Sequence, residues 1–474
     1  MNAPVPARPL RIFLVACEES GDRLGAGLMQ ALARSAGRPV EYIGIGGRHM
    51  AEQGLASLFP VDQLAIVGFN AVFARLPMLL RRIRETANAV LAQRPDILVI
   101  IDSPDFTHRV ARRVRAAAPE IPIVDYVSPT VWVWRPGRAR AMRRYVDHVL
   151  ALLPFEPQVH QRLGGPPCTY VGHPLIESAS DLRPDAAERA RRGATPPVLL
   201  VLPGSRTSEI ARHLDLFGTA VQLIDARCGP LELVLPTVPA VLDKVVQGTA
   251  QWPIRPKIVI DTADKWRAFR IARAALAVSG TVTLELALAG VPNVVVYRVS
   301  LLEEAIGRLF LRGSTIVLAN LVLGEKAVPE LLQHNATAEQ LAAAVTPLLG
   351  ATPERARQVD AFARLDSVMQ IGKALPSARA AHIVLETLVR RILRSYQHRR
   401  KSSVGMSNPK PHQCREPEVR KSIAANSTAN FGFKNGTRII KLLVSLCFRR
   451  LLKCLPQRNT SAGSGTLVRR KAPS

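Results

Sequence analysis

The 474-residue sequence contains no apolar run of the roughly 18–20 residues that a transmembrane helix requires. Its six cysteines have neither the spacing of a zinc site nor that of a disulfide framework, which predicts a reduced, intracellular chain. Aromatic residues make up only 5% of the chain, which disfavours a nucleic-acid-binding surface built on base stacking. Acidic residues are also scarce, 37 against 64 Lys and Arg, so the formal net charge is +27.

Much of that charge lies in residues 398–474, which contain 17 Lys and Arg and only two acidic residues. This basic tail carries +15 and has no alternation of strands and helices, so we expect it to be disordered. Its amphipathic stretch 438–453 suits an anionic membrane surface or nucleic-acid phosphates, and an extension without a role is the third interpretation. The remaining +12 belongs to residues 1–397.

The rest of the chain alternates short apolar runs with helical patterns, which predicts parallel sheets covered by helices on both faces. We expect an α/β fold of two doubly wound, Rossmann-like domains facing across a cleft, at residues 8–180 and 198–355. Residues 181–197 are the expected linker. Residues 356–397 are expected to form C-terminal helices that pack back on the N-terminal domain.

Two polar loops follow apolar strands in the first half. Asp102 stands directly after the strand 97–101, where a carboxylate is poorly placed for packing and well placed to act as a general base. Glu18 and Ser20 lie in the first loop and would project into the cleft. The alternatives are structural: Ser20 or Asp22 would cap the helix that follows, and Asp105 would cap the next one.

Two loops of the second half suit a diphosphate. Gly204 and Ser205 follow the strand 198–202, and Arg206 could pair with a phosphate, although the loop lacks the Gly-Lys-Ser/Thr ending of a P-loop. Ser279, Gly280 and Thr281 lead into a helix whose first turn offers backbone N–H groups, with Glu285 on the same face for ribose hydroxyls. A well-capped helix is the alternative. No metal site is visible, because no Asp-x-Asp stands beside a strand end.

An apolar segment, 65–80, runs into an arginine cluster, which suits the interface of a bilayer with anionic head groups. A buried helix face is the alternative interpretation. The predicted membrane patch consists of Phe69, Phe73, Leu76, Met78, Leu79, Leu80, Arg81 and Arg82.

Taken together and in this order, these pieces resemble lipid-A-disaccharide synthase of Gram-negative bacteria. The resemblance covers about residues 8–390. It rests on the segments 18–22, 101–106, 126–129, 153–156, 203–206, 279–281 and 318–321, together with Glu285. One position departs from the family pattern, because Cys17 replaces the glycine expected before Glu18.

The resemblance implies a GT-B glycosyltransferase that is metal-independent, inverting and without a cofactor. It would join UDP-2,3-diacylglucosamine to 2,3-diacylglucosamine 1-phosphate through a β-1,6 linkage and release UDP. Asp102 would be the base, and Glu18, Ser20, Asp105 and Asn320 would line the acceptor side. Gly204, Ser205, Arg206, Ser279, Gly280, Thr281 and Glu285 would hold the UDP-sugar. The expected location is cytoplasmic and peripheral on the inner membrane, with no nucleic-acid partner and with a homodimer left open.

Two other functions remain open at this point. The same scaffold could carry another GT-B enzyme acting on UDP-N-acetylglucosamine, an epimerase or a transferase, which would not need the apolar patch. The net charge of +27 alone suggests a basic protein that binds nucleic acid or membrane through its tail. Truncation at residue 397 separates these functions, because transferase activity should survive it and tail-dependent binding should not.

Overall fold

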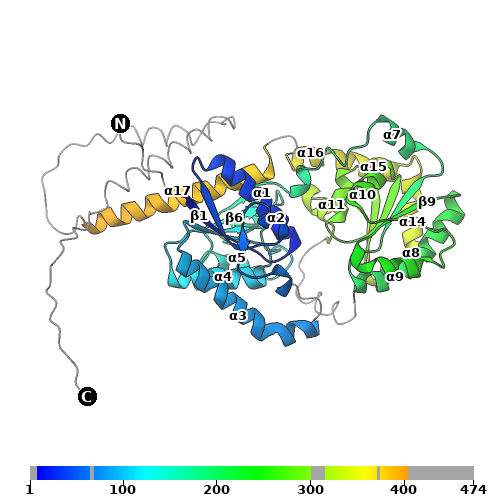
Figure 1. Ribbon diagram of the computed structural model, residues 1–474. Coiled ribbons are helices and arrows are strands. Elements are labelled where there is room, and N and C mark those ends of the chain that lie inside the picture. Colours follow the sequence, from blue (N-terminus) through cyan, green and yellow to red (C-terminus); the bar gives the residue numbers. More distant parts are fainter. Residues whose placement is uncertain (1–7, 65–68, 300–314, 371–373, 404–474) are drawn as a thin grey trace, which may run out of the picture. The chain divides into compact units, whose positions relative to one another are not determined.

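The computed structural model describes residues 8–64, 69–299, 315–370 and 374–403 (Figure 1). Side chains at position 62, at 69–76 and from 394 onward are outside the description, as is the basic tail. The described residues form one compact unit that contains two parallel sheets.

The N-terminal sheet has seven strands in the order β3-β2-β1-β4-β5-β6-β7, and every neighbouring pair is parallel. The strands are β1 (Leu10–Ala16), β2 (Val40–Ile45), β3 (Ala56–Ser57), β4 (Ile97–Ile101), β5 (Ile123–Tyr126), β6 (His148–Ala151) and β7 (Cys168–Tyr170). The connecting helices are α1 (Glu19–Ser35), α2 (Arg48–Ala51), η1 (Val61–Gln63), α3 (Phe69–Gln93), α4 (Pro104–Ala117), α5 (Gly137–Met142), α6 (Glu156–Arg162) and η2 (Pro174–Ile176). All five residues of β4 are buried, as expected for a central strand covered on both faces.

The C-terminal sheet has six parallel strands in the order β10-β9-β8-β11-β12-β13. The strands are β8 (Val198–Leu202), β9 (Glu232–Pro236), β10 (Lys257–Val259), β11 (Ala274–Val278), β12 (Asn293–Tyr297) and β13 (Glu330–Leu332). The helices are α7 (Ala186–Gly193), α8 (Thr207–Cys228), η3 (Pro239–Val241), α9 (Leu242–Thr249), α10 (Thr262–Ile271), α11 (Val282–Leu288), α13 (Leu318–Leu323), η4 (Gln333–Asn335), α14 (Ala338–Leu349), α15 (Pro353–Ala363), α16 (Leu365–Val368) and α17 (Pro376–Ser403).

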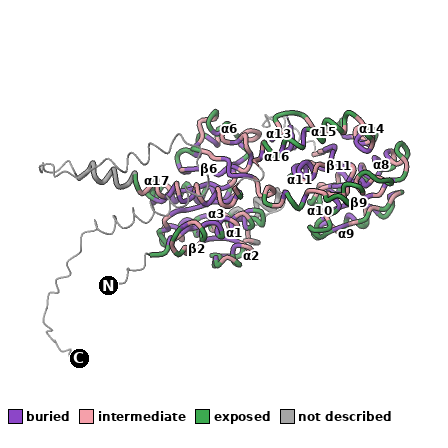
Figure 2. The backbone as a smooth tube through the Cα atoms, turned by 90° about the horizontal axis from the view of Figure 1, so that it is seen from above, coloured by how far each residue is buried: buried purple, intermediate pink, exposed green. Residues whose placement is uncertain are grey.

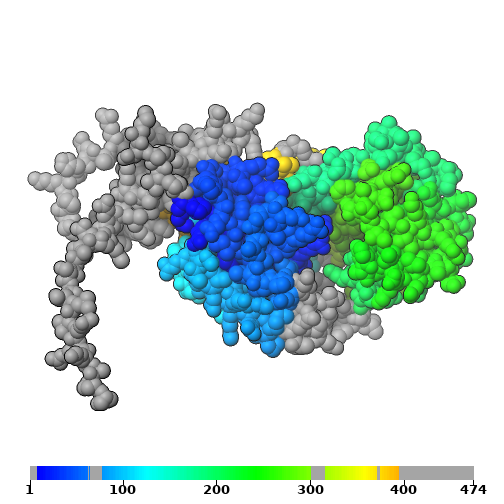
Figure 3. All heavy atoms as spheres, viewed as in Figure 1, coloured from blue at the N-terminus to red at the C-terminus, as the bar shows by residue number. Residues whose placement is uncertain are grey.

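Each sheet has its own hydrophobic core. Figure 2 shows the buried backbone concentrated in strands such as β6 and β11, with exposed stretches along outer helices such as α9. In Figure 3 the blue-to-cyan atoms of the N-terminal sheet and its helices cluster together, and so do the green atoms of the C-terminal ones. The expected α/β class with two parallel sheets is therefore confirmed.

Both ends of the C-terminal half depart from a simple tandem arrangement. The expected linker contains α7, which begins with an Asp185–Glu188 capping box, and Leu182 is fully buried in the core of the C-terminal sheet. Further along, α15 and α16 contribute Phe362 and Leu365 to that same core. The last helix, α17, instead lies beside α1 and β6 of the N-terminal sheet (Figure 1).

The order of strands places the functional loops. Neighbours of β1 are β2 on one side and β4 on the other, so the connections leave in opposite directions from the gap between β1 and β4. In the C-terminal sheet, β8 and β11 flank the corresponding gap. Ligands of doubly wound sheets bind beyond the carboxyl ends of the strands at such switch points. The loops after β1, β4, β8 and β11 are therefore where a site is expected.

Candidate active site

Asp102 stands at the carboxyl end of β4, the central strand beside β1. Its φ of +52° and the φ of +45° at Ser103 place two consecutive non-glycine residues in the left-handed region. Such a conformation costs on the order of 1 kcal/mol or more per residue, and it clusters at functional sites. The Asp102 carboxylate accepts a hydrogen bond from the Ser103 N–H at 2.7 Å.

The environment of Asp102 favours its neutral form. Burial raises the pKa of this carboxyl, and the nearby charges of Glu18 and Asp125 raise it further, against the opposing hydrogen bond from the Ser103 N–H. A carboxylate with a raised pKa is a stronger base when it is ionised. The strained loop therefore presents a partly desolvated carboxylate suited to accepting a proton.

The loop after β1 meets the loop after β4. The Ser103 hydroxyl donates to the Glu18 carboxylate at 3.1 Å, a contact that follows from the pairing of β1 with β4. Glu18 and Ser20 are exposed, and Glu18 occupies the N-cap position of α1 without a side-chain cap. Cys17 is buried just below them, which raises the pKa of its thiol and makes it unreactive.

Asp22 has a role that the sequence did not predict. Its buried carboxylate accepts hydrogen bonds from the backbone N–H groups of Gly47, His49 and Met50, at 2.7, 2.8 and 3.1 Å. It therefore holds the loop that follows β2, and it does not cap α1. Asp105 lies in the first turn of α4, is 86% exposed and forms an ion pair with Arg138 at 3.1 Å.

A buried polar cluster supports the neighbouring loop after β5, and sequence reasoning missed most of it. Val127 there has a φ of +89°, and Ser128 is hydrogen-bonded to the His160 ring at 2.8 Å. Glu156 accepts the Leu153 N–H at 2.8 Å, and burial raises its pKa to about 8. The sequence signal was the Pro-Phe-Glu that follows β6; nothing in the sequence pointed to His160.

A pocket of about 450 Å³ lies at the switch point of the C-terminal sheet. It is lined by Leu202, Gly204, Ser205, Arg206, Glu209, Pro236, Thr237, Val238, Lys265, Val278, Ser279, Gly280, Thr281, Val282 and Glu285. The structure thus brings together all seven residues that the sequence assigned to a UDP-sugar. Six of them come from two loops about 75 residues apart, after β8 and after β11, and Glu285 comes from α11.

One carboxylate organises the first of these loops. Glu209 of α8 accepts the backbone N–H groups of Ser205 at 2.9 Å and of Arg206 at 3.2 Å, and it pairs with the Arg206 guanidinium at 3.1 Å. Gly204 has a φ of +114°, and a Cβ there would lie 2.5 Å from the Glu209 carboxylate. Two N–H donors of this loop therefore already have a partner within the protein. The Arg206 side chain is 73% exposed, and its ion pair with Glu209 holds the guanidinium at the pocket.

The second loop is more open. A Cβ on Gly280 would meet nothing within 4 Å, so the backbone there is accessible to a ligand. The Ser279 hydroxyl donates to the Ile316 carbonyl at 2.9 Å, and Thr281 occupies the N-cap position of α11. The first turn of a helix has N–H groups without intrahelical partners, which suits an anion.

Glu285 is paired with a residue that the sequence did not indicate. The Lys265 ammonium lies 2.5 Å from the Glu285 carboxylate, and both side chains line the pocket. Lys265 is also 5.5 Å from the centre of the Phe269 ring. The sequence could not indicate this pair, because it forms only when α10 and α11 fold against the same pocket.

Asn320 lies inside the C-terminal domain. Its side chain is 1% exposed, donates to Glu330 and to the Val328 carbonyl, both at 2.9 Å, and accepts the Val328 N–H at 2.8 Å. Both polar atoms of this amide are thereby used to hold the segment before β13.

The predicted membrane patch is only partly described, because the side chains of Phe69, Phe73 and Leu76 lie outside the description. Leu79 and Leu80 are partly buried against the N-terminal core. Arg82 lies over the Phe59 ring at 4.4 Å and pairs with Glu85 at 2.6 Å, whereas Arg81 is exposed. Met78 is half-buried.

Two further observations concern metals and membranes. No group of three or more His, Cys, Asp and Glu side chains among the described residues could hold a metal ion. Within the same residues, none of the helices combines the length and the apolar character needed to cross a bilayer.

Two parallel sheets with polar loops at both switch points define the GT-B class of α/β protein. The fold is similar to that of a UDP-N-acetylglucosamine 2-epimerase from Neisseria meningitidis solved with UDP-N-acetylglucosamine, with a TM-score of 0.54 at 11% identity over 80% of this chain and 100% of that one. It is also similar to the N-terminal domain of a Candida albicans trehalose-6-phosphate phosphatase, with a TM-score of 0.52 at 10% identity over 82% and 98% of the two chains. At such identities the likeness concerns the fold alone.

Sequence comparison identifies the family within that class. The family described as lipid-A-disaccharide synthetase matches residues 12–384. A lipid-A-disaccharide synthase of Nitrobacter hamburgensis is 61% identical over 378 residues, which are 80% of this chain and 96% of that protein. One from Rhodospirillum centenum is 45% identical over 392 residues, 82% of this chain and 98% of that protein. The chain belongs to the lipid-A-disaccharide synthetase family, which makes it a glycosyltransferase and confirms the resemblance seen in its motifs.

Proposed function

We propose that this chain joins UDP-2,3-diacylglucosamine to 2,3-diacylglucosamine 1-phosphate through a β-1,6 bond and releases UDP. Membership of the family supports the reaction. The observation that carries it to named residues is the 450 Å³ pocket, which gathers all seven predicted UDP-sugar residues at one switch point.

In this proposal the C-terminal domain, residues 198–355, binds the UDP-sugar. Arg206, held by Glu209, and the loop Ser279–Thr281 meet the two phosphates, because a guanidinium and the N–H groups at the start of a helix both stabilise phosphate oxygens. Glu285, oriented by Lys265, accepts hydrogen bonds from the ribose hydroxyls. In this proposal the Arg206 guanidinium and the backbone N–H groups meet the phosphate charge without a metal ion.

The N-terminal domain, residues 8–180, binds the acceptor. Asp102 takes the proton of the acceptor 6-hydroxyl while that oxygen attacks C1 of the donor sugar, and the bond from C1 to the phosphate oxygen breaks with its electron pair leaving on UDP. A single displacement of this kind inverts the configuration at C1. Glu18, Ser20 and Asp105 are the further residues proposed for the acceptor side. Asn320, whose buried amide holds the segment before β13, would support the site without touching the acceptor.

Both lipid substrates belong to a bilayer surface, so the proposal places the enzyme peripherally on the cytoplasmic face of the inner membrane. The segment from Phe69 to Arg82 is the proposed contact. Leu79 and Leu80 of this segment are half-buried against the N-terminal core, so only the side of α3 that faces away from that core is available to lipid.

The test is an assay with both lipid substrates in detergent, with and without EDTA, followed by mass detection of the disaccharide 1-phosphate. Disaccharide formed in EDTA supports the reaction, and a strict metal requirement contradicts the mechanism. Asp102→Asn should bind UDP with unchanged affinity and lose turnover, whereas Asp243→Asn, exposed on α9, should behave as wild type. Normal turnover of Asp102→Asn would remove it as the base.

A further inference from the structure

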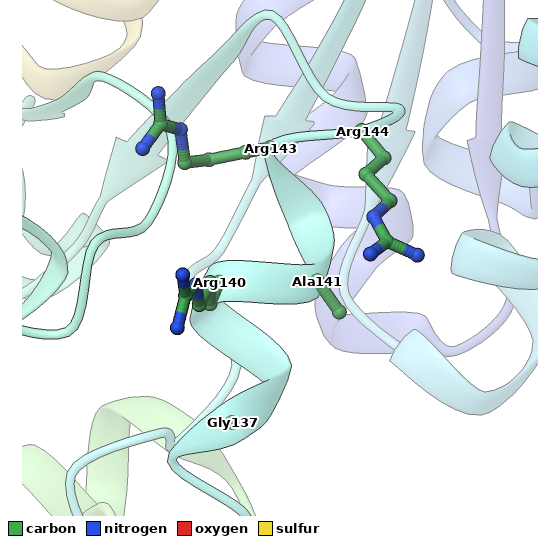
Figure 4. A pocket seen from close by; sticks show the side chains of 5 residues that line it. All are labelled: Gly137, Arg140, Ala141, Arg143 and Arg144. Carbon is green, nitrogen blue, oxygen red and sulfur yellow. The ribbon is translucent and has the colours of Figure 1, made fainter.

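A second pocket, of about 400 Å³, lies in the N-terminal domain and is lined by Gly137, Arg140, Ala141, Arg143 and Arg144 (Figure 4). We call it the arginine pocket. Arg140 lies in the last turn of α5, Arg143 is the residue at the end of that helix, and Arg144 follows it. Figure 4 shows the side chains of Arg140 and Arg143 extending to one side of α5 and that of Arg144 to the other.

The buried residues between them fix this arrangement. Ala139 and Met142 are fully buried, and Tyr145 is 4% exposed, whereas the three arginines of the pocket are exposed. The segment is therefore anchored through Ala139, Met142 and Tyr145, which leaves the three arginine side chains exposed to solvent. A backbone held in this way presents its charges with less loss of conformational entropy on binding than a flexible loop would.

The acidic side chains near the arginine pocket already have other partners. Asp105 pairs with Arg138 at 3.1 Å, Asp147 pairs with Arg115, and Asp125 is buried against His108 at 3.1 Å. Among the described residues, no ion pair includes an arginine of the pocket, and no acidic residue lines it. Guanidinium groups that line one cavity repel one another, and an anion from outside the chain would relieve that repulsion.

The positive surface continues onto α4. Arg109, Arg112 and Arg113 are exposed there, and the Arg112 guanidinium lies 5.1 Å from the centre of the Tyr145 ring, next to Arg144 in the chain. Helix α4 in turn packs beside α3, the helix of the proposed membrane contact. The arginine pocket thus belongs to the same group of helices as that contact.

We propose that the arginine pocket binds the phosphate groups of an anionic lipid surface. Guanidinium groups recognise phosphate oxygens in pairs of hydrogen bonds, and basic clusters on an enzyme at a membrane bind acidic head groups. No aromatic side chain lines the pocket, as base stacking would require, which favours lipid over nucleic acid. The choice of lipid among phosphate compounds rests on the proposed function, whereas the anion site itself rests on the geometry.

Vesicle binding of the full chain tests the proposal directly. The variant Arg140→Gln/Arg143→Gln/Arg144→Gln is compared with Arg227→Gln/Arg255→Gln/Arg267→Gln, which removes three exposed arginines from the C-terminal domain and gives the same net charge. On vesicles of phosphatidylcholine with phosphatidylglycerol, we expect the first variant to bind on the order of 100-fold more weakly than wild type. The second should bind within about twofold of wild type, since any contribution of the tail is common to all three proteins.

Equal weakening of both variants would overturn the proposal, because net charge alone would then explain the binding. So would unchanged vesicle binding of the first variant, including the case in which it loses affinity only for an RNA oligonucleotide. Hydrogen exchange of residues 137–146 distinguishes the source of the phosphate. Protection by the anionic vesicles supports the proposal, whereas protection by free glucosamine 1-phosphate alone assigns the pocket to a soluble sugar phosphate and overturns it.

These measurements are independent of catalysis. A chain that forms no disaccharide but binds vesicles through the arginine pocket contradicts the proposed function alone. Normal disaccharide synthesis in detergent by the first variant, with unchanged vesicle binding, contradicts the lipid site alone.

Discussion

Replacing Glu209 tests whether a carboxylate inside the UDP-sugar pocket positions Arg206 or competes with the substrate. Glu209→Ala removes three hydrogen bonds, two to backbone N–H groups and one to the Arg206 guanidinium at 3.1 Å. A hydrogen bond to a charged group contributes about 1.5–3 kcal/mol when buried, and less for an arginine as exposed as this one. We therefore expect KM for the UDP-sugar to rise about tenfold, equivalent to about 1.4 kcal/mol, while kcat changes less than about threefold.

Initial rates over a range of UDP-sugar concentrations, together with calorimetric titration of UDP, measure this effect. Glu354→Ala is the matched control, because Glu354 forms an i,i+3 pair with Arg357 at the same 3.1 Å on α15, away from the pocket. Glu209→Gln should lie between wild type and Glu209→Ala, since the amide oxygen can still accept one backbone N–H. A lower KM in Glu209→Ala would refute the reasoning, because it would mean that the carboxylate occupies donors that the phosphates of the substrate need.

Four further outcomes follow from the loops of the two sheets. Asp102→Asn should lower kcat at least about 100-fold. Burial raises the pKa of Asp102, so ionisation of its carboxyl destabilises the folded state as pH rises through that pKa. The variant should therefore unfold at a higher temperature than wild type at neutral pH. In wild type, kcat should fall on the acidic side with a midpoint above the ordinary pKa of an aspartate; a midpoint at or below it would contradict the assignment. Gly204→Ala should destabilise the fold by about 1–3 kcal/mol in urea unfolding, more than Gly229→Ala, whose positive φ is similar but whose Cβ would meet nothing within 4 Å. Lys265→Met should weaken UDP binding about tenfold relative to Lys244→Met. Equal UDP affinities of the two variants would show that the ion pair of Lys265 with Glu285 does not contribute to nucleotide binding.

The sequence was sufficient for the strands that bury both faces. Apolar runs such as 97–101 and 198–202 correspond to β4 and β8 with the same bounds. A run of five consecutive large apolar side chains is typical of a strand that is covered on both faces. The short edge strands β3, β7 and β13 were not predicted, because two or three residues carry no periodicity. Helix α3 begins at Phe69, within the apolar segment 65–80.

For the site, residues that directly follow a strand could be found, and residues that depend on strand order could not. Asp102 and Gly204 are in the first group, because each comes immediately after a buried run. The contact between Glu18 and Ser103 requires β1 beside β4, and the pair of Lys265 with Glu285 requires α10 beside the loop after β11. At Asp22 the local pattern was misleading. It predicted a cap for the helix that follows, whereas the side chain accepts hydrogen bonds from the loop after β2.

The return of α17 to the first sheet has a consequence for synthesis of the chain on the ribosome. Ala380, Val384 and Leu388 of this helix are buried, and Ser377 lies 3.7 Å from the position that a Cβ on Gly27 of α1 would take. The N-terminal domain therefore acquires its last covering element only after the whole C-terminal domain has been translated. Until then the face of α1 that receives α17 is open, so a chain stalled before residue 376 is a natural substrate for chaperones and proteases. The two domains consequently complete their folding in the reverse of the order in which they are made.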